Sequence, residues 1–379
     1  MLKVALVRGK HLNNYEGQNY LFDSGQVRLT AIGSLNPIDG NFPFPVISLP
    51  SPADIPIFTS AVKYLANRLI GDMHYLYRLN SLKDKFDIFH TADPYYFFSY
   101  QLAKLRQRKL IKKLIFTSWE TIAFNNETVE KKKRIKYFSI GQADLFICHT
   151  EKAKQVLLAE GVKPDKIRLV RLGVDINKFK RSTINFKQKN DLTILFVGRL
   201  AEEKGVTDLY ETYKRLKMQR SKIKSKTQNL KLRIIGQGGL ENNLRTGIAD
   251  DGLSDDVSLE KKDYFKMPRV YREADVLVLP AKTTKTWEEQ YGMVLIEAMA
   301  CGLPIVAYNS GAIGEVIGGA GILVKEGSGR DLASAIKRLI ENRAEREKLG
   351  KMGRYRAIKY FAAGDTAERL KQIYLQIAG

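Results

Sequence analysis

The residues of this chain best suited to chemistry lie between Glu289 and Pro304, which reads EQYGMVLIEAMACGLP. Two acids, Glu289 and Glu297, stand eight positions apart, and Gly292 lies between them. The glycine at the entry and the Gly-Leu-Pro exit predict one short helix, with Glu297 about two turns beyond Glu289 at roughly 3.6 residues per turn. Unpaired amides and the positive dipole at a helix N-terminus suit an anion such as a phosphate. An amphipathic helix with solvated glutamates is the open alternative.

A second group of charged residues follows an expected strand at 192–197. The segment Gly198 to Gly205 reads GRLAEEKG, so two cations, Arg199 and Lys204, flank a turn before a helix. The guanidinium of Arg199 can bind phosphate oxygens in a forked geometry, and Lys204 adds a point charge. A glycine turn, Gly236 to Gly239, follows the next expected strand at 230–235. The alternative for the turn at 198–205 is a solvated charged loop.

These segments together resemble the signature of the retaining GT-B glycosyltransferases of family 4. In that family two glutamates eight residues apart flank a Phe/Tyr-Gly pair and lead into an EAMA-x-GLP helix, after a GR-x-x-x-x-KG element and a G-x-G turn. The stretch Gly173-Val174-Asp175 with Phe179, and the run Ser310 to Glu315, extend the resemblance. Gly314 stands where proline is common in the family.

The resemblance implies roles for the matching residues. Glu297 would bind the donor ribose, and Glu289 the hydroxyls of the transferred sugar. Backbone amides at the helix start would meet the phosphates. The implied catalytic residues are Glu289, Arg199 and Lys204. The implied donor-binding residues are Arg199, Lys204, Gly236, Glu289, Gly292, Met293, Val294 and Glu297.

The resemblance also implies a mechanism. Fixed cations and amide dipoles would stabilise the departing diphosphate, so no metal and no cofactor are expected beyond the nucleotide-diphospho-sugar itself. No side chain stands out as a nucleophile, and retention then fits departure and attack on the same face of the sugar. The four histidines show no paired ligand spacing, which agrees with the expectation of no metal site.

Candidate acceptor residues come from the first half of the chain, where loops follow expected strands. The loop after the strand at 3–8 carries Glu16 and Gly17, the strand at 86–90 ends at His90 and is followed by Asp93, and the strand at 114–117 is followed by Trp119 and Glu120. An aromatic beside an acid suits a sugar face and its hydroxyls, but an interface tryptophan and a turn glycine are open alternatives. Many family members have a second histidine at the position of Ala92, so its absence puts a role for His90 in doubt.

The expected elements alternate between strands and helices, which predicts an α/β fold. By resemblance this is the GT-B architecture: two Rossmann-like domains facing a central cleft, with the last helix crossing back to the N-terminal domain. We expect an acceptor domain at 1–180, completed by a helix at about 366–379, and a donor domain at 181–365. We also expect a long helical pattern at 57–82, a helix from about Glu16, and Thr150 as a helix N-cap.

Composition narrows the class of protein. The 379 residues carry 63 Lys and Arg against 41 Asp and Glu, a net charge of +22. Basic runs at 104–113 and 131–136 could meet an anionic membrane, so a peripheral membrane contact joins the nucleotide-sugar donor and a glycan or lipid-linked acceptor among the expected partners. Solvated lysine-rich faces are the alternative. Two isolated cysteines and no apolar run of about 20 residues predict a cytoplasmic protein, with the inner membrane face as a further location.

Two other classes of function remain open. One is a different GT-B enzyme, such as a sugar phosphorylase or a nucleotide-sugar epimerase. The other is a basic nucleic-acid-binding protein, suggested only by charge, and no RNP, zinc or helix-turn-helix signature supports it. Nucleic acid is therefore not an expected partner.

Overall fold

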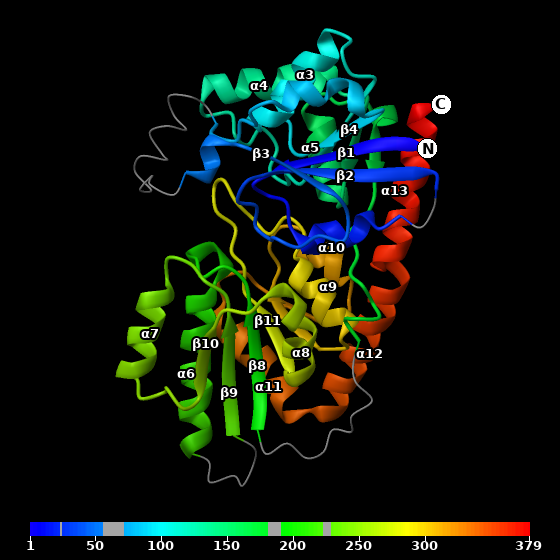
Figure 1. Cartoon of the computed structure of the whole chain (residues 1–379). Helices are drawn as coiled ribbons and strands as arrows, with labels where there is room; N and C mark the ends of the chain where they lie inside the picture. The colour runs from blue at the N-terminus through cyan, green and yellow to red at the C-terminus, as the bar shows by residue number, and fades with distance from the viewer. Residues whose placement is uncertain (23–24, 56–71, 181–190, 223–228) are drawn as a thin grey trace. The chain divides into compact units, whose positions relative to one another are not determined.

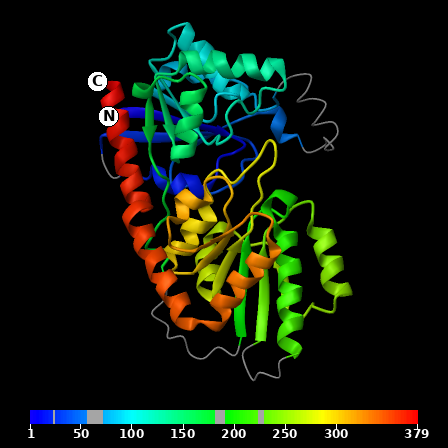
Figure 2. The same cartoon turned by 180° about the vertical axis from the view of Figure 1, so that it is seen from behind.

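The structure is a computed structural model that describes residues 1–22, 25–55, 72–180, 191–222 and 229–379. Its contacts divide the chain into two compact units, residues 1–173 with 363–379, and residues 174–362. Each unit is built on one parallel sheet with helices against it (Figures 1 and 2). The α/β class expected from the alternating pattern is confirmed.

The first unit contains a seven-stranded sheet in the order β3-β2-β1-β4-β5-β6-β7. Its strands are β1 Leu2–Gly9, β2 Val27–Ser34, β3 Val46–Leu49, β4 Ile88–Thr91, β5 Lys113–Ser118, β6 Leu145–Cys148 and β7 Ile167–Leu169. Its helices and 3-10 turns are α1 Asn14–Gly17, η1 Gln18–Tyr20, η2 Pro52–Asp54, η3 Leu79–Lys85, α3 Phe97–Gln107, α4 Glu130–Gln142, α5 Glu151–Ala159, η4 Pro164–Lys166 and α13 Ala363–Ala378.

Alternate residues of these strands pack on opposite faces of the sheet, and both faces are buried. Val7, Phe89 and Phe116 point into a core shared with α3. Leu6 and Ile115 point into the other core, which Leu370 and Tyr374 of α13 complete. Strands buried on both sides carry continuous apolar runs, which is why they could be found from sequence.

The second unit contains a six-stranded sheet in the order β10-β9-β8-β11-β12-β13. Its strands are β8 Asp191–Val197, β9 Asn229–Ile235, β10 Val257–Glu260, β11 Val276–Leu279, β12 Ile305–Tyr308 and β13 Ile322–Val324. Its helices and 3-10 turns are η5 Glu202–Lys204, α6 Val206–Lys222, α7 Glu241–Asp250, η6 Tyr264–Lys266, α8 Met267–Glu273, α9 Met293–Ala300, α10 Ile313–Ile317, α11 Gly329–Glu341 and α12 Arg343–Tyr360.

The unit boundaries fall at 173/174 and 362/363, whereas the sequence placed them at 180/181 and 365/366. Residues 174–179 pack with the second unit because Arg354 holds them: its guanidinium donates to the carbonyls of Ile176 and Phe179. Val174 also donates its amide to the carbonyl of Phe361.

The predictions of individual helices and caps had different outcomes. Thr150 caps α5 by accepting a hydrogen bond from the amide of Ala153, as predicted. Of the helix predicted at 57–82, residues 57–71 lie outside the described part, 72–78 are not helical, and the rest falls in the 3-10 segment η3. The prediction is wrong for 72–78 because side chains satisfy that backbone: Gln101 bonds both the amide and the carbonyl of Leu76.

The helix predicted from about Glu16 starts earlier and is shorter. It is the single turn α1, capped by the Asn13 side chain, and it continues as η1. Within the described residues, no helix has both the length and the hydrophobicity needed to cross a membrane.

Candidate active site

The candidate site of the second unit lies where β8, β9, β11 and β12 end, because their following loops pack against one another there. Gly236, after β9, lies so near the turn after β8 that an added Cβ would stand 1.9 Å from the carbonyl oxygen of Gly198. Gly311, after β12, also lies close to the loop after β11, and an added Cβ would stand 2.2 Å from the carbonyl oxygen of Glu289. Glycine at both positions lets four loops meet at the edge where open parallel sheets bind ligands.

Lys204 and Glu289 form the charged centre of this edge. The Lys204 ammonium lies 2.6 Å from Oε2 of Glu289, and both side chains are largely buried. The same ammonium stands over the indole of Trp287, 4.6 Å from the ring centroid. Trp287 is held by a tight turn in which its amide donates to Oγ1 of Thr284. The pair joins a cation suited to a phosphate with a carboxylate suited to sugar hydroxyls.

Arg199 belongs to the same loop but is placed differently. Its side chain is 61% exposed and forms an ion pair with Glu203, one turn along. A surface pair of this kind is weak, so the guanidinium can change partners at little cost. The structure therefore leaves Arg199 accessible to an anion.

The helix predicted after Gly292 is present as α9. Gly292 is its N-cap, with a φ of 77° that favours glycine. The first amides of an α-helix have no carbonyl within the helix to bond, so the amides at Gly292, Met293 and Val294 lie where an anion would be stabilised. Met293 and Val294 are half-buried, whereas the following six residues are buried.

Glu297 lies inside α9 and is almost fully buried. Its Oε2 accepts a 2.6 Å hydrogen bond from the hydroxyl of Tyr271 on α8. Burial raises the pKa of Glu297 to about 7, and the hydrogen bond from Tyr271 opposes that shift. Near neutral pH such a carboxyl group is present in both its protonated and its ionised form, so it can donate a hydrogen bond to a hydroxyl or accept one from it.

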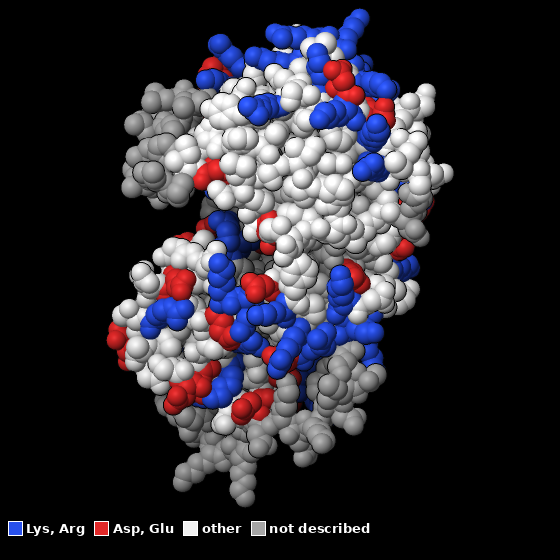
Figure 3. Space-filling model, in the orientation of Figure 1, with Lys and Arg blue, Asp and Glu red and all other residues white. Residues whose placement is uncertain are grey.

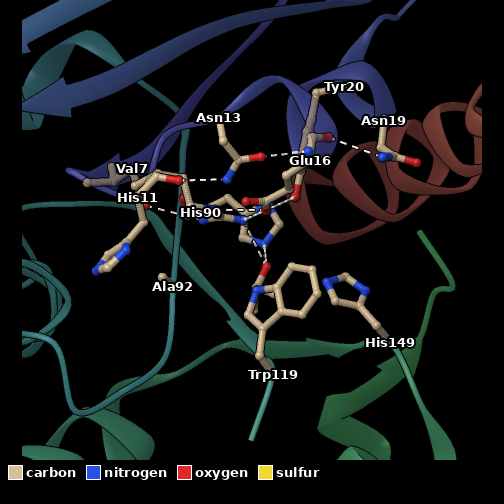
Figure 4. A network of polar contacts seen from close by, with 12 residues as sticks. Val7, His11, Asn13, Glu16, Asn19, Tyr20, His90, Ala92, Trp119 and His149 are labelled. Carbon is tan, nitrogen blue, oxygen red and sulfur yellow. Dashed lines mark hydrogen bonds and ion pairs between the residues drawn. The ribbon is translucent and has the colours of Figure 1, made fainter. Parts of the chain in front are cut away.

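The first unit has its own polar cluster at the equivalent edge of its sheet, and Figure 4 shows it closely. Arg8, at the end of β1, is buried and ion-paired with Glu16 at 2.7 Å. Its guanidinium also donates to Tyr20 and to Oγ1 of Thr117. Glu16 accepts from Tyr20 as well, so the predicted acceptor residue Glu16 is engaged inside the unit.

His90 closes this network. Its Nδ1 lies 2.6 Å from the hydroxyl of Tyr374 and its Nε2 lies 2.7 Å from Oγ1 of Thr117. The ring is completely buried, and burial followed by the nearby Arg8 charge lowers its pKa well below the usual value. His90 thus joins β4 to α13 as a neutral imidazole. Gly17, also buried, has Phe44 where a Cβ would point.

The remaining acceptor candidates lie together after β4 and β5. Asp93 accepts the amide of Trp119 at 3.0 Å, and burial raises the pKa of Asp93 to about 7. Trp119 is half-buried and packs edge-on against His149, with ring centroids 4.5 Å apart. Glu120 is buried, and its carboxylate accepts four hydrogen bonds from the loop that follows it.

Sequence reasoning missed several residues of these two edges. Trp287 and Tyr271 support the Lys204–Glu289 pair and Glu297, and Arg8 and Tyr374 anchor the first unit's network. An arginine at the end of an apolar strand was a usable signal for a buried ion pair. Across the described ranges, no group of three or more His, Cys, Asp or Glu side chains is placed to hold a metal ion.

Comparison with solved structures defines the class. The fold matches HepE of Anabaena, crystallised with UDP, at a TM-score of 0.74 and 15% identity over 99% of this chain and 100% of that one. It matches sucrose-phosphate synthase of Thermosynechococcus elongatus at a TM-score of 0.73 and 18% identity over 100% and 99%. The architecture is therefore GT-B, as the sequence led us to expect.

Sequence comparison gives the family. Residues 177–356 match the model of "Glycosyl transferases group 1", and residues 39–178 match that of "Glycosyltransferase Family 4". The chain belongs to this family of glycosyltransferases.

Two curated relatives are similar over part of their length. The amylovoran biosynthesis glycosyltransferase AmsK of Erwinia amylovora is 31% identical over 64% of this chain and 59% of the relative. The D-inositol 3-phosphate glycosyltransferase of Pseudarthrobacter chlorophenolicus is 30% identical over 57% and 52%. The chain thus spans about half the length of the curated relatives it matches.

Proposed function

We propose that this protein is a retaining, metal-independent hexosyltransferase that moves a sugar from a nucleotide-diphospho-sugar to a glycan, lipid-linked or small-molecule acceptor. The observation that carries the proposal is the Lys204–Glu289 pair, 2.6 Å apart, beside the N-terminus of α9. It puts a cation, a carboxylate and helix amides at one edge of one sheet. The cation and the amides suit the anionic diphosphate of an activated sugar, and the carboxylate suits the hydroxyl groups of its neutral sugar ring.

On this proposal each group has one task. Lys204 leaves Glu289 for the diphosphate, and Arg199 leaves Glu203 for the same oxygens. Glu289, released from Lys204, accepts hydrogen bonds from hydroxyls of the transferred sugar, while Glu297 binds the ribose. The amides at the start of α9 stabilise the charge that grows on the leaving phosphate.

The bond changes balance without a protein nucleophile. The bond between the anomeric carbon and the diphosphate oxygen breaks, and its electron pair stays on the diphosphate. The acceptor oxygen forms the new bond from the same face of the sugar, and its proton passes to the departing phosphate oxygen. The fixed cations and amides provide the stabilisation that a divalent ion would otherwise give.

The names of the relatives guide the choice of substrates. HepE has been crystallised with UDP-glucose, so UDP-sugars are the first donors to test. AmsK is named for amylovoran biosynthesis, so we propose a growing polysaccharide in the cytoplasm, carried on a lipid at the inner membrane face, as the first acceptor. Inositol phosphate is the second, from the D-inositol 3-phosphate enzyme.

A thermal-shift panel tests the donor. The protein is heated with uridine, guanosine and adenosine diphosphates and their sugars, each with and without EDTA. A ligand present at about 100 times its Kd should stabilise the protein by about 2.7 kcal/mol, and one base should stand out. Stabilisation lost on chelation would contradict metal independence, and no response to any nucleotide would overturn the proposal.

Turnover assays then separate the enzyme classes. Transfer to an acceptor, with the anomeric configuration of the product determined by NMR, is the expected result. Release of a sugar 1-phosphate from a glycan by free phosphate, without a nucleotide donor, would indicate a phosphorylase, and conversion of the donor to its epimer without any acceptor would indicate an epimerase. A product of inverted configuration would reject the retaining mechanism.

A further inference from the structure

Trp287 lies in the loop that joins β11 to α9, and a tight turn fixes its backbone. The amide of Thr284 donates to the carbonyl of Trp287 at 2.7 Å, and the amide of Trp287 donates to Oγ1 of Thr284 at 3.0 Å. The same hydroxyl donates to the carbonyl of Trp287 at 3.2 Å. Because bonds run in both directions between the two ends of the turn, the loop itself sets the place of the half-buried indole.

The base of this loop is bonded to the loop that carries Lys204. The amide of Lys282 donates to the carbonyl of Glu203, the residue before Lys204, at 2.8 Å. The ammonium of Lys282 lies 3.0 Å from Oδ1 of Asp208 on α6. These two contacts join the loops, so the indole of Trp287 and the side chain of Lys204 meet although they are far apart in the chain.

The ammonium of Lys204 therefore has two partners of different kinds. It lies 2.6 Å from Oε2 of Glu289 and 4.6 Å from the centroid of the Trp287 ring. The Lys204 side chain is only 15% exposed, so both contacts are partly shielded from water and gain strength from that. Figure 3 shows basic and acidic side chains intermingled over the second unit, and a surface pair such as Arg245 with Glu241 is far more exposed and weaker.

The two partners of the ammonium differ in whether they can stay when a donor binds. On the proposed function, Glu289 releases Lys204 in order to accept hydrogen bonds from sugar hydroxyls. The contact with the indole of Trp287 need not break, because the negative face of the ring attracts the cation without engaging one particular N–H group. An ammonium has three N–H donors, and these remain available to phosphate oxygens.

We propose that Trp287 is a positioning residue for the donor diphosphate: its indole face holds the Lys204 ammonium in place while the ammonium exchanges Glu289 for phosphate oxygens. A free lysine side chain loses much rotamer freedom when it is fixed by a ligand. Because the indole already restricts the ammonium in the unliganded protein, the diphosphate binds at a lower entropic cost. The inference rests on the proposed function, since that function supplies the diphosphate.

A direct contact between the indole and the transferred sugar is the main alternative role for Trp287. In the structure the ammonium of Lys204 stands over the ring face that a sugar would need, which favours the role through Lys204. The two roles predict a different dependence on the ligand. A role through Lys204 requires only a diphosphate, whereas a direct contact requires the sugar.

Titration calorimetry tests the proposal with three ligands: inorganic pyrophosphate, the nucleoside diphosphate selected by the thermal-shift panel, and its nucleoside. Trp287→Leu should weaken the binding of both phosphate compounds by about threefold to thirtyfold, the factor that corresponds to a cation–π contact. The affinity for the nucleoside, which has no phosphate, should stay at the wild-type value. Trp287→Phe keeps an aromatic face and should recover most of the lost affinity. A distorted nucleotide site would instead lose the nucleoside as well.

A double-variant cycle shows whether the effect passes through Lys204. In the Lys204→Gln protein, Trp287→Leu should have no further effect on pyrophosphate binding, because the ammonium that the indole holds is gone. The matched control is Tyr355→Leu, which removes a 64% exposed ring of α12 that also has a lysine over it, with the Lys359 ammonium 5.7 Å from the centroid. This control should leave all three affinities unchanged.

Each remaining outcome decides the role of Trp287. Wild-type affinity for pyrophosphate in Trp287→Leu, an equal loss with and without Lys204, or a loss confined to ligands that carry the sugar would overturn the proposal. Pyrophosphate binding that depends on Trp287, in a protein that binds no nucleotide, would reject the proposed function and leave the role of Trp287 standing. Sugar transfer by Trp287→Leu with a wild-type donor KM would do the reverse, and no binding of any ligand by the wild type would overturn both.

Discussion

The two units place charged groups at the same edge of the same kind of sheet, yet they use them in opposite ways. In the second unit, Lys204 and Glu289 form a small cluster with an accessible Arg199 nearby. In the first unit, Arg8, Glu16 and His90 are buried and bonded to one another or to neighbouring hydroxyls. On the proposed function, the Lys204–Glu289 cluster exchanges its partners for a ligand, whereas the network around Arg8 holds the first unit together. The position of a charged residue at this edge of a sheet therefore does not by itself identify a binding residue.

The largest effect should come from breaking the buried network. Arg8→Met leaves Glu16 buried without its cation, and should lower the free energy of unfolding by about 3–5 kcal/mol. Urea titration followed by tryptophan fluorescence measures this, since Trp119 lies in the first unit and Trp287 in the second. Arg28→Met, which removes an exposed arginine of β2, is the control and should change stability by less than about 0.5 kcal/mol. Equal effects of the two variants would show that the network does not stabilise the unit.

The next effect concerns the exchangeable pair. Glu289→Gln should lower the turnover rate on the order of tens- to a thousand-fold, because it removes one contact to the transferred sugar. Its effect and that of Lys204→Gln should not add in the double variant, since the two side chains contact each other. Glu202→Gln removes an exposed charge from the loop that carries Lys204, and it serves as the control. Wild-type turnover in Glu289→Gln would contradict the assigned role.

A smaller effect should follow from separating the glycine-packed loops. Gly236→Ala puts a methyl group 1.9 Å from the carbonyl oxygen of Gly198, so one loop must move. We expect a loss of about 1–3 kcal/mol in stability and weaker nucleotide binding. Gly239→Ala meets no atom within 4 Å and is the matched control. Denaturant titration and thermal shift measure both quantities, and equal behaviour of the two variants would argue against close packing as the reason for Gly236.

The smallest effect is a dependence of stability on pH. The pKa of Glu297 is about 7 in the folded protein, above the ordinary value of 4.5. Below about pH 4.5 the carboxyl is protonated in both states, and as the pH rises towards 7 only the folded protein keeps the proton. Stability is therefore lost over that window, on the order of 1–2 kcal/mol between about pH 5 and pH 7.

Glu297→Gln should flatten that part of the stability curve measured by denaturant titration at a series of pH values. Asp93→Asn should do the same for the first unit, because burial raises the pKa of Asp93 to about 7 too. If stability fell more steeply between about pH 5 and pH 7 in either variant than in the wild-type protein, the buried carboxyl group would not be the cause of the loss.

The sequence predicted most of the fold, since strands buried on both faces have a strong apolar signal. β8 and β9 lie within one residue of the strands predicted at 192–197 and 230–235, and α9 begins after Gly292 as expected. Residues 72–78 were misassigned because side chains from elsewhere, such as Gln101, satisfy their backbone. The sequence around residues 72–78 does not show these hydrogen bonds to distant side chains.

The two sites were predictable to different degrees. The family resemblance singled out Glu289, Lys204 and the start of α9 as site candidates, although Lys204 and Glu289 lie 85 residues apart in the chain. The surroundings of His90 were not predictable, since its partner Tyr374 lies 284 residues away in the chain. Whether Asp93, Trp119 and Glu120 meet an acceptor stays a prediction.

The position of α13 has a consequence for how the protein is made. Leu370 and Tyr374 belong to the core of the first unit, although about half of the chain separates them from the rest of it. The second unit is continuous and can fold as soon as it leaves the ribosome. The core of the first unit is complete only when residues 363–379 have been made, although the rest of that unit is synthesised first.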